Sequence, residues 1–195
     1  SENKSNLFSN FPHMENKIPR RLLYLNTITI DMYHDMFYYK VKKYRAKEIT
    51  FLKPIYWKEP HSNRFLSHLK GLKKVSAEYM RDIKKLSMTK QVFYSLASLT
   101  IHYFENKNHA FLSQTKALKR LTNLQILDSK VGTKTYESKI HPITSLKKAT
   151  IHTRNATPLM KLAKFAKVLN LDCTSLSFNS LKSMNRLRRM LIYFG

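Results

Sequence analysis

Two histidines and one aspartate are the side chains of this sequence best suited to proton-transfer chemistry. His152 and Asp172 are 20 residues apart, and His102 precedes His152 by 50 residues. An imidazole beside a carboxylate can act as a general base that the carboxylate orients. Because no nucleophile accompanies the pair, the sequence favours the simpler interpretation, a polar pair on neighbouring strands of a binding face.

Motifs for other catalysis and for cofactors are missing from the sequence. Three glycines in 195 residues leave no room for a Gly-rich phosphate-binding loop. Neither HExxH nor a paired CxxC occurs, so no zinc site is expected. The single cysteine, Cys173, excludes an internal disulfide and fits a reducing, intracellular compartment. We therefore predict a non-enzymatic protein without metal or cofactor.

The charge of the chain is strongly unbalanced. It has 36 Lys and Arg residues against 12 Asp and Glu residues, a net charge of +24. Such an excess predicts attraction to a polyanion, which can be a nucleic acid, an anionic membrane or an acidic protein. No run of about 18 apolar residues occurs, so no membrane span is expected.

A short apolar pattern recurs along the chain and must supply the elements that position these side chains. In "LKRLTNLQILDSKV", residues 118–131, Leu118, Leu121 and Leu124 are spaced by three, whereas Leu124 and Ile126 are spaced by two. This change of period is typical of a helix or turn that leads into a strand. The first inward strand residue of each copy lies at positions 28, 49, 75, 99, 124, 149, 169 and 190, at intervals of 20 to 26 residues.

Copies such as "FYSLASLTI" and "ITSLKKATI" resemble the leucine-rich repeat, L-x-x-L-x-L. The resemblance extends from Leu22 over almost the whole chain. It implies an α/β fold, a solenoid with a curved parallel sheet and a helical or irregular convex side. The family usually has Asn or Cys three residues after the second strand leucine. Other residues stand there in this chain and predict an irregular array: Tyr33, Phe104, Ser129, Arg154, Thr174 and Gly195.

The chain is divided here into an N-terminal extension or cap, residues 1–21, and an array of about eight repeats, residues 22–195. An apolar run around Leu86 is interpreted as convex-side structure, and "LKPIYWKEPH", which contains Trp57, as a loop. The array is predicted to be open at its C-terminal end, because only "LIYFG" follows Met190. A protein partner is expected to cover this last repeat.

Two of the segments between strands carry helix signals. In "TPLMKLAKFAK", Thr157 is expected to be the N-cap and Pro158 the first helical residue. In "NSLKSMNRL", Leu181, Met184 and Leu187 are spaced to lie on one face of a helix.

The residue between the two inward positions of each strand must point to the opposite, concave face. Across the eight copies this row is polar in all places except Leu191: the other residues are Thr29, Thr50, Ser76, Thr100, Gln125, Thr150 and Asn170. A second outward row contains Asp31, Leu52, Glu78, His102, Leu127, His152, Asp172 and Tyr193. The candidate residues for binding a partner on this face are Thr100, His102, Gln125, Thr150, His152 and Asp172. His102 and His152 would lie two strands apart, roughly 10 Å, too far to share a metal.

Basic residues recur just before the strand positions, in three pairs and singly at Lys47 and Lys167, and are expected to share one lateral edge. Equivalent positions of a solenoid stack, so these residues are predicted to bind RNA or another polyanion along one lateral edge: Lys73, Lys74, Lys147, Lys148, Arg188 and Arg189. The segment "YYKVKKYRAKE", residues 38–48, interleaves tyrosines with Lys40, Lys42, Lys43 and Arg45, which can grip phosphates while the rings stack on bases. The alternative is convex packing, with lysine stems lying over inward tyrosines.

Two functions fit these features. The first is a non-enzymatic scaffold of a ribonucleoprotein, such as a ribosome, that contacts RNA through the basic edge. The second is an adaptor that recognises an acidic protein through its concave sheet. Basic charge and one thiol suit the mitochondrial matrix, the nucleus and the cytosolic ribosome equally.

Overall fold

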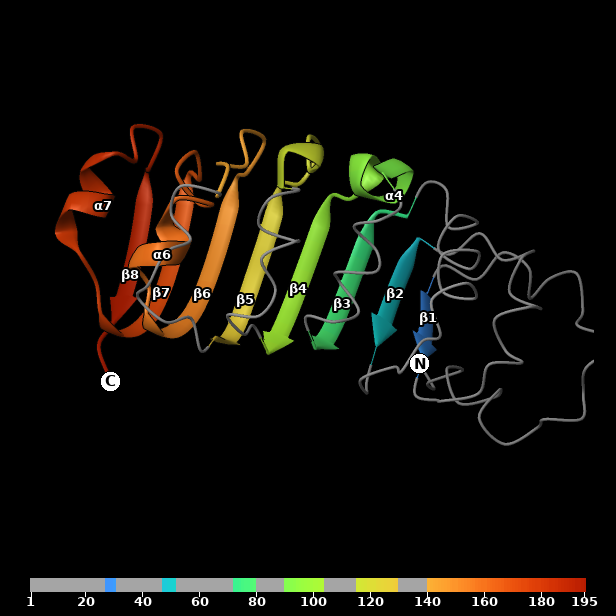
Figure 1. Ribbon diagram of the computed structural model, residues 1–195, viewed down its shortest axis with the longest axis horizontal. Helices are drawn as coiled ribbons and strands as arrows, with labels where there is room; N and C mark the ends of the chain where they lie inside the picture. The colour runs from blue at the N-terminus through green and yellow to red at the C-terminus, as the bar shows by residue number, and fades with distance from the viewer. Residues whose placement is uncertain (1–26, 31–46, 52–71, 80–89, 104–114, 130–139) are drawn as a thin grey trace, which may run out of the picture.

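The protein contains one parallel sheet whose strands follow one another in sequence order. The computed structural model describes residues 27–30, 47–51, 72–79, 90–103, 115–129 and 140–195. Within these ranges, each of seven consecutive strand pairs is parallel, and the strand order is β1 to β8 without a crossover (Figure 1). The strands are β1 (Thr27–Ile30), β2 (Glu48–Phe51), β3 (Lys74–Tyr79), β4 (Ser98–Tyr103), β5 (Asn123–Ser129), β6 (Lys148–Asn155), β7 (Val168–Ser175) and β8 (Arg189–Tyr193).

The register of the sheet follows the spacing of the apolar residues. Backbone partners join the eight predicted positions in one row: Ile28, Ile49, Val75, Leu99, Leu124, Ala149, Leu169 and Met190. A slip of one residue at any strand would turn its apolar side chains to the opposite face, which explains why this register is selected. The predicted strands and their register are confirmed.

The core lies on the side of the sheet covered by the connecting segments. From β3 to β7 the first inward side chains are fully buried, and so are the second ones in β4 to β6. From β4 to β7, the side chains three and six residues before the strand position, such as Leu96 and Phe93 before Leu99, are also buried. Each repeat therefore packs a strand against its own preceding turn and against the next repeat, which removes apolar surface from water.

Short helices precede some strands. They are α4 (Lys90–Ser95), the 3-10 helix η4 (Thr115–Ala117), α6 (Thr157–Met160) and α7 (Phe178–Lys182). The N-cap of α6 is Ala156, not Thr157, so that prediction was wrong. The Thr157 N–H donates to Asn155 Oδ1 at 3.1 Å instead, while Thr157 Oγ1 accepts the N–H of Ser177 at 3.0 Å from the next repeat. Pro158 still occupies the first turn, where its missing N–H leaves no bond unmade.

A bulge interrupts the register between β5 and β6. Ile126 pairs with Ile151, but the next pair joins Ser129 to Thr153, so β5 carries one extra residue. Asp128 takes up this residue with a φ of 48°, a left-handed conformation that Asp tolerates better than most side chains. Leu127 therefore does not stand in register beside His152, and the predicted second outward row is broken at this strand.

At β8 the apolar surface is open. Met190, Leu191, Tyr193 and Phe194 are exposed, whereas Ile192, Leu181 and Leu187 are partly buried against the core. The helix predicted for "NSLKSMNRL" was wrong in extent, because α7 ends at Lys182 and leaves Met184 and Leu187 outside it, although Met184 is still buried. The segments around Leu86 and Trp57 lie outside the described residues.

Candidate nucleic-acid interface

The basic residues are held by a main-chain feature that repeats from strand to strand. The Lys47 carbonyl accepts the N–H groups of both Lys73 and Lys74, each at 2.9 Å. The Lys73 carbonyl in turn accepts the N–H groups of Ala97 and Ser98, at 2.8 and 2.9 Å. Each carbonyl just before a strand therefore fixes two consecutive residues of the following repeat.

The same feature continues to β8. The Lys147 carbonyl accepts the N–H groups of Lys167 and Val168, both at 2.9 Å. The Lys167 carbonyl accepts those of Arg188 and Arg189, at 2.8 and 3.1 Å. Because one shared carbonyl satisfies two donors at every step, the start of each strand is set at the same height. Side chains at these positions must line up along one edge of the sheet.

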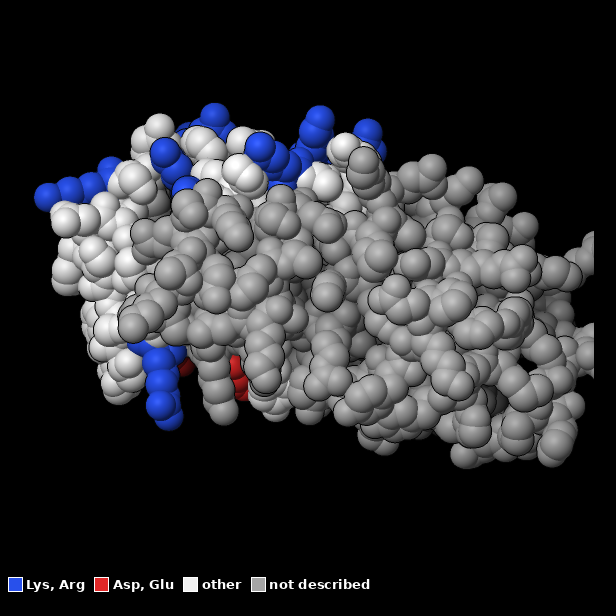
Figure 2. Space-filling view, in the orientation of Figure 1, with Lys and Arg blue, Asp and Glu red and all other residues white. Residues whose placement is uncertain are grey.

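We call this surface the basic edge. Its members are exposed and lie at the amino ends of the strands: Lys47, Lys73, Lys74, Lys147, Lys148, Lys167, Arg188 and Arg189. Figure 2 shows Lys and Arg side chains gathered along this edge, which is uppermost in the view. All eight residues were predicted to share one edge, and the structure brings them to it. The predicted Lys40, Lys42, Lys43 and Arg45 lie outside the described residues.

The basic edge has two charged parts and a neutral middle. At β4 and β5 the equivalent positions hold Ala97 with Ser98 and Thr122 with Asn123. In the part formed by β2 and β3, the Lys74 Nζ pairs with Glu48 Oε1 at 2.8 Å, which offsets one positive charge.

The part formed by β6 to β8 carries the greater charge. Residues 140–195 contain ten Lys and Arg residues against one acidic residue, Asp172, so 10 − 1 gives +9. Five members of the basic edge, from Lys147 to Arg189, lie in this part. Like charges held at neighbouring strands repel one another, and an anion placed between them relieves that repulsion. This part is the stronger candidate for contact with a polyanion.

Two contacts between an aromatic ring and a cation of the following repeat also lie near this edge, and the sequence reasoning missed them. Lys119 Nζ lies 5.7 Å from the centre of the Tyr94 ring. The guanidinium of Arg186 lies 5.0 Å from the centre of the Phe165 ring. An alignment of consecutive repeats could have predicted them, because each ring and its cation lie the same number of residues before their own strands.

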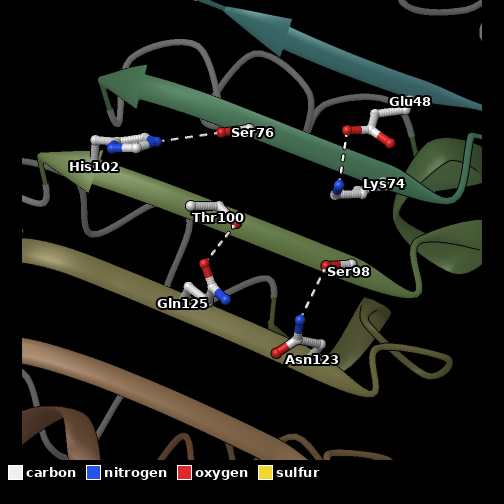
Figure 3. Close-up of polar contacts among 8 residues, drawn as sticks. All are labelled: Glu48, Lys74, Ser76, Ser98, Thr100, His102, Asn123 and Gln125. Carbon is white, nitrogen blue, oxygen red and sulfur yellow. Dashed lines mark hydrogen bonds and ion pairs between the residues drawn. The ribbon is translucent and has the colours of Figure 1, made fainter. Parts of the chain in front are cut away.

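The face of the sheet that points away from the core, which was predicted to be concave, carries polar side chains that are linked across strands (Figure 3). Thr100 Oγ1 donates to Gln125 Oε1 at 3.3 Å, and a 3.3 Å hydrogen bond joins Ser76 Oγ to His102 Nε2. Together with Thr150, these side chains are partly exposed, as predicted for the row that faces away from the core. This face can offer hydrogen bonds to a partner.

His152 and Asp172 are backbone partners on β6 and β7, as predicted. His152 Nδ1 lies 4.0 Å from Asp172 Oδ2, longer than a hydrogen bond, and the two side chains are 44% and 53% exposed. A separation of this size in water gives only a weak attraction. His102 contacts Ser76 rather than either of them, and among the described residues no group of three potential metal ligands forms. The pair fits the polar interpretation better than that of an oriented general base.

Cys173 lies in the same strand as Asp172 but points into the core. Burial raises the pKa of its thiol, and the Asp172 carboxylate raises that pKa further. A thiol of this kind is a poor nucleophile at neutral pH. None of the helices in the described part of the chain is long and apolar enough to cross a membrane.

Comparisons with known proteins identify no family. No protein-family model matches the sequence, and no curated protein sequence matches it. Among solved structures, the fold is similar to the "TLR13-ssRNA13 complex" with a TM-score of 0.26 and 12% sequence identity, over 88% of this chain. The chain spans only 36% of the length of that neighbour. A TM-score of this size is too low to carry an argument about the shared fold or about the bound RNA.

Proposed function

We propose that this chain is an irregular leucine-rich-repeat solenoid that serves as a non-enzymatic scaffold in a ribonucleoprotein. Eight parallel strands in sequence order, with inward residues recurring every 20 to 26 positions, support the repeat assignment. In the leucine-rich-repeat family, an Asn or Cys after the strand hydrogen-bonds the backbone of the loop. In β6 another residue makes such a bond. Asn155, one position later than expected, accepts the Thr157 N–H and orders the turn.

The observation that carries the proposal is the alignment of the basic edge. Shared carbonyls bring Lys147, Lys148, Lys167, Arg188 and Arg189 into one exposed row along three strands. Phosphate groups recur at regular short intervals along a nucleic acid and match such a row better than an isolated anion does. Binding releases the counterions that the nucleic acid had condensed, which favours association at low salt.

A pair of charge reversals tests the proposal. The variant Lys147→Glu/Lys148→Glu changes the basic edge, and Arg154→Glu/Lys182→Glu is its matched control. The control residues are exposed but lie off the edge, Arg154 near the carboxyl end of β6 and Lys182 in α7. Both variants lower the net charge by four, so non-specific attraction falls equally.

We expect the edge variant to bind an RNA oligonucleotide on the order of tenfold more weakly at about 0.1 M salt, with a shallower dependence of log affinity on log salt. The control variant should lose much less. Circular dichroism and thermal unfolding verify that both variants keep the fold. Equal losses in the two variants would reject the basic edge as the binding surface.

The second candidate function is an adaptor that binds an acidic protein through the concave face. The observation in its favour is the partly exposed polar row that includes Thr100, Gln125 and Thr150. This function predicts a complex that tolerates salt and that changes on the concave face disrupt, whereas the first function predicts the reverse.

A further inference from the structure

Two aromatic side chains stand beside the basic edge in register with cations of the following repeat. Tyr94 lies five residues before Leu99, and Lys119 lies five residues before Leu124. Because Leu99 and Leu124 are backbone partners, Tyr94 and Lys119 occupy the same place in consecutive repeats. The register therefore produces the 5.7 Å contact between Lys119 Nζ and the Tyr94 ring.

The contact between Arg186 and Phe165 arises in the same way, from residues four rather than five positions before the strand residue. Phe165 lies four residues before Leu169, Arg186 lies four residues before Met190, and Leu169 pairs with Met190. The Arg186 guanidinium lies 5.0 Å from the centre of the half-buried Phe165 ring, and Lys164 Nζ lies 5.9 Å from it. A planar guanidinium held over a ring is itself a flat surface on which a base can stack.

Both pairs lie at the amino ends of the strands, where the basic edge lies. The positions four and five residues before each strand residue precede the edge positions by only two to four residues. Ser95 and Ser145 each stand four residues before the strand residue and contact the preceding repeat. Their hydroxyls donate to the carbonyls of Leu72 and Leu121, at 2.7 and 2.8 Å. Figure 1 shows α4, which carries Tyr94, at this end of the sheet.

The Tyr94 pair also falls where the basic edge is neutral. The repeat of β4 has Ala97 and Ser98 at the edge, and there Tyr94 is 42% exposed. Moving from β3 to β6, the order along the edge is therefore a lysine pair, an exposed tyrosine with a lysine, and a second lysine pair. These three strand intervals span about 14 Å at ~4.8 Å each.

We propose that the basic edge binds single-stranded RNA, with phosphates on its lysines and arginines and bases stacked on Tyr94 and on the Arg186–Phe165 pair. The inference rests on the proposed contact with RNA and specifies the kind of RNA. Surfaces that bind single strands combine a positive track with flat side chains, because every unpaired base has a free face. In a duplex the bases are stacked on one another, and Tyr94 and Arg186 would have nothing to stack on.

The test removes flat surfaces without removing charge. Tyr94→Leu replaces an exposed ring, and Arg186→Lys keeps the positive charge of an exposed side chain but not its plane. Both are compared with the unchanged chain for binding to an unstructured RNA oligonucleotide and to a duplex of the same length. The oligonucleotide carries 2-aminopurine, whose fluorescence falls when the base stacks. Lys147→Glu/Lys148→Glu is measured beside them.

We expect each single variant to bind the single strand roughly fivefold or more weakly, to quench 2-aminopurine less, and to leave duplex binding within about twofold. The slope of log affinity against log salt should stay unchanged, since no phosphate contact is lost. Equal effects on both RNAs, or no effect, while Lys147→Glu/Lys148→Glu still weakens binding, would overturn this inference and leave the proposed function standing. If the lysine variant also binds normally, the proposed function fails as well.

Discussion

Leu124 and Gln125 are consecutive residues of β5 with opposite environments. The Leu124 side chain is fully buried between the equivalent residues Leu99 and Ala149, whereas Gln125 is partly exposed on the opposite face of the sheet. Leu124→Ala should lower the free energy of unfolding by about 2–5 kcal/mol, because it opens a cavity in the core. Gln125→Ala should lower it by less than about 0.5 kcal/mol. Urea unfolding of both variants measures this contrast, and equal losses would contradict the register.

The bulge at Asp128 makes a second prediction about stability. Its φ of 48° is left-handed, a conformation that costs a β-branched side chain roughly 1–2 kcal/mol. Asp128→Val should therefore destabilise the fold by about that amount, whereas Asp128→Gly should be neutral or slightly stabilising. Thermal unfolding compares the two. A valine variant as stable as the glycine variant would show that β5 has no bulge.

Reversal of the six predicted edge residues to Glu should abolish association with RNA while the fold is kept. The residues are Lys73, Lys74, Lys147, Lys148, Arg188 and Arg189. A triple Ala variant at Thr100, Gln125 and Thr150 is the comparison, and its RNA affinity should change by less than about twofold. Fluorescence anisotropy at several salt concentrations measures both. Loss of the bound partner only in the triple variant would favour the adaptor function.

The pH dependence of stability should carry a contribution from Cys173. Burial, followed by the Asp172 carboxylate, raises the pKa of the Cys173 thiol above its ordinary 9.0. The folded chain then keeps the proton to higher pH than the unfolded chain does. The contribution is full below about pH 9 and is lost as pH rises through the folded-state pKa.

The free energy of unfolding should accordingly fall more steeply above pH 9 for the unchanged chain than for Cys173→Ala. Denaturant unfolding at several pH values measures the two slopes. Parallel slopes would mean that the thiol titrates alike in both states. Slow alkylation of Cys173 by iodoacetamide at pH 7.5, relative to the unfolded chain, is the independent check.

The strands and their register could be predicted because burial acts with a period of two. At β4, Leu99 and Ile101 must be inward for the repeat to close, and Thr100 has no other direction to point. The positions of the edge residues could be predicted for the same reason, since Lys73 and Lys147 stand at fixed distances before inward residues. Most residues of the candidate interface could therefore be predicted from the sequence.

Local features that depend on a single turn could not be predicted from the sequence. Thr157 was expected to be an N-cap. Instead, the Asn155 carboxamide oxygen accepts the Thr157 N–H, and the Thr157 hydroxyl accepts the N–H of Ser177 in the next repeat. The bulge at Asp128 is equally hidden, because the spacing from Leu124 to Ala149 does not reveal an extra residue within β5. The pairing of Arg186 with Phe165 requires comparison of two repeats, and neither segment alone indicates it.

The shared carbonyls have a consequence for how the protein opens. Each repeat is held by the one before it, and Lys167 is the acceptor that ties Arg188 and Arg189 of β8 to the array. In such a linear arrangement a strand with two sheet neighbours opens less readily than a strand with one, and within the described residues β8 pairs only with β7. Amide hydrogens of β8 should exchange with solvent faster than those of β6. An anion bridging Lys167 and Arg188 would link these repeats through their side chains, and slower exchange at β8 would then report occupancy of the edge.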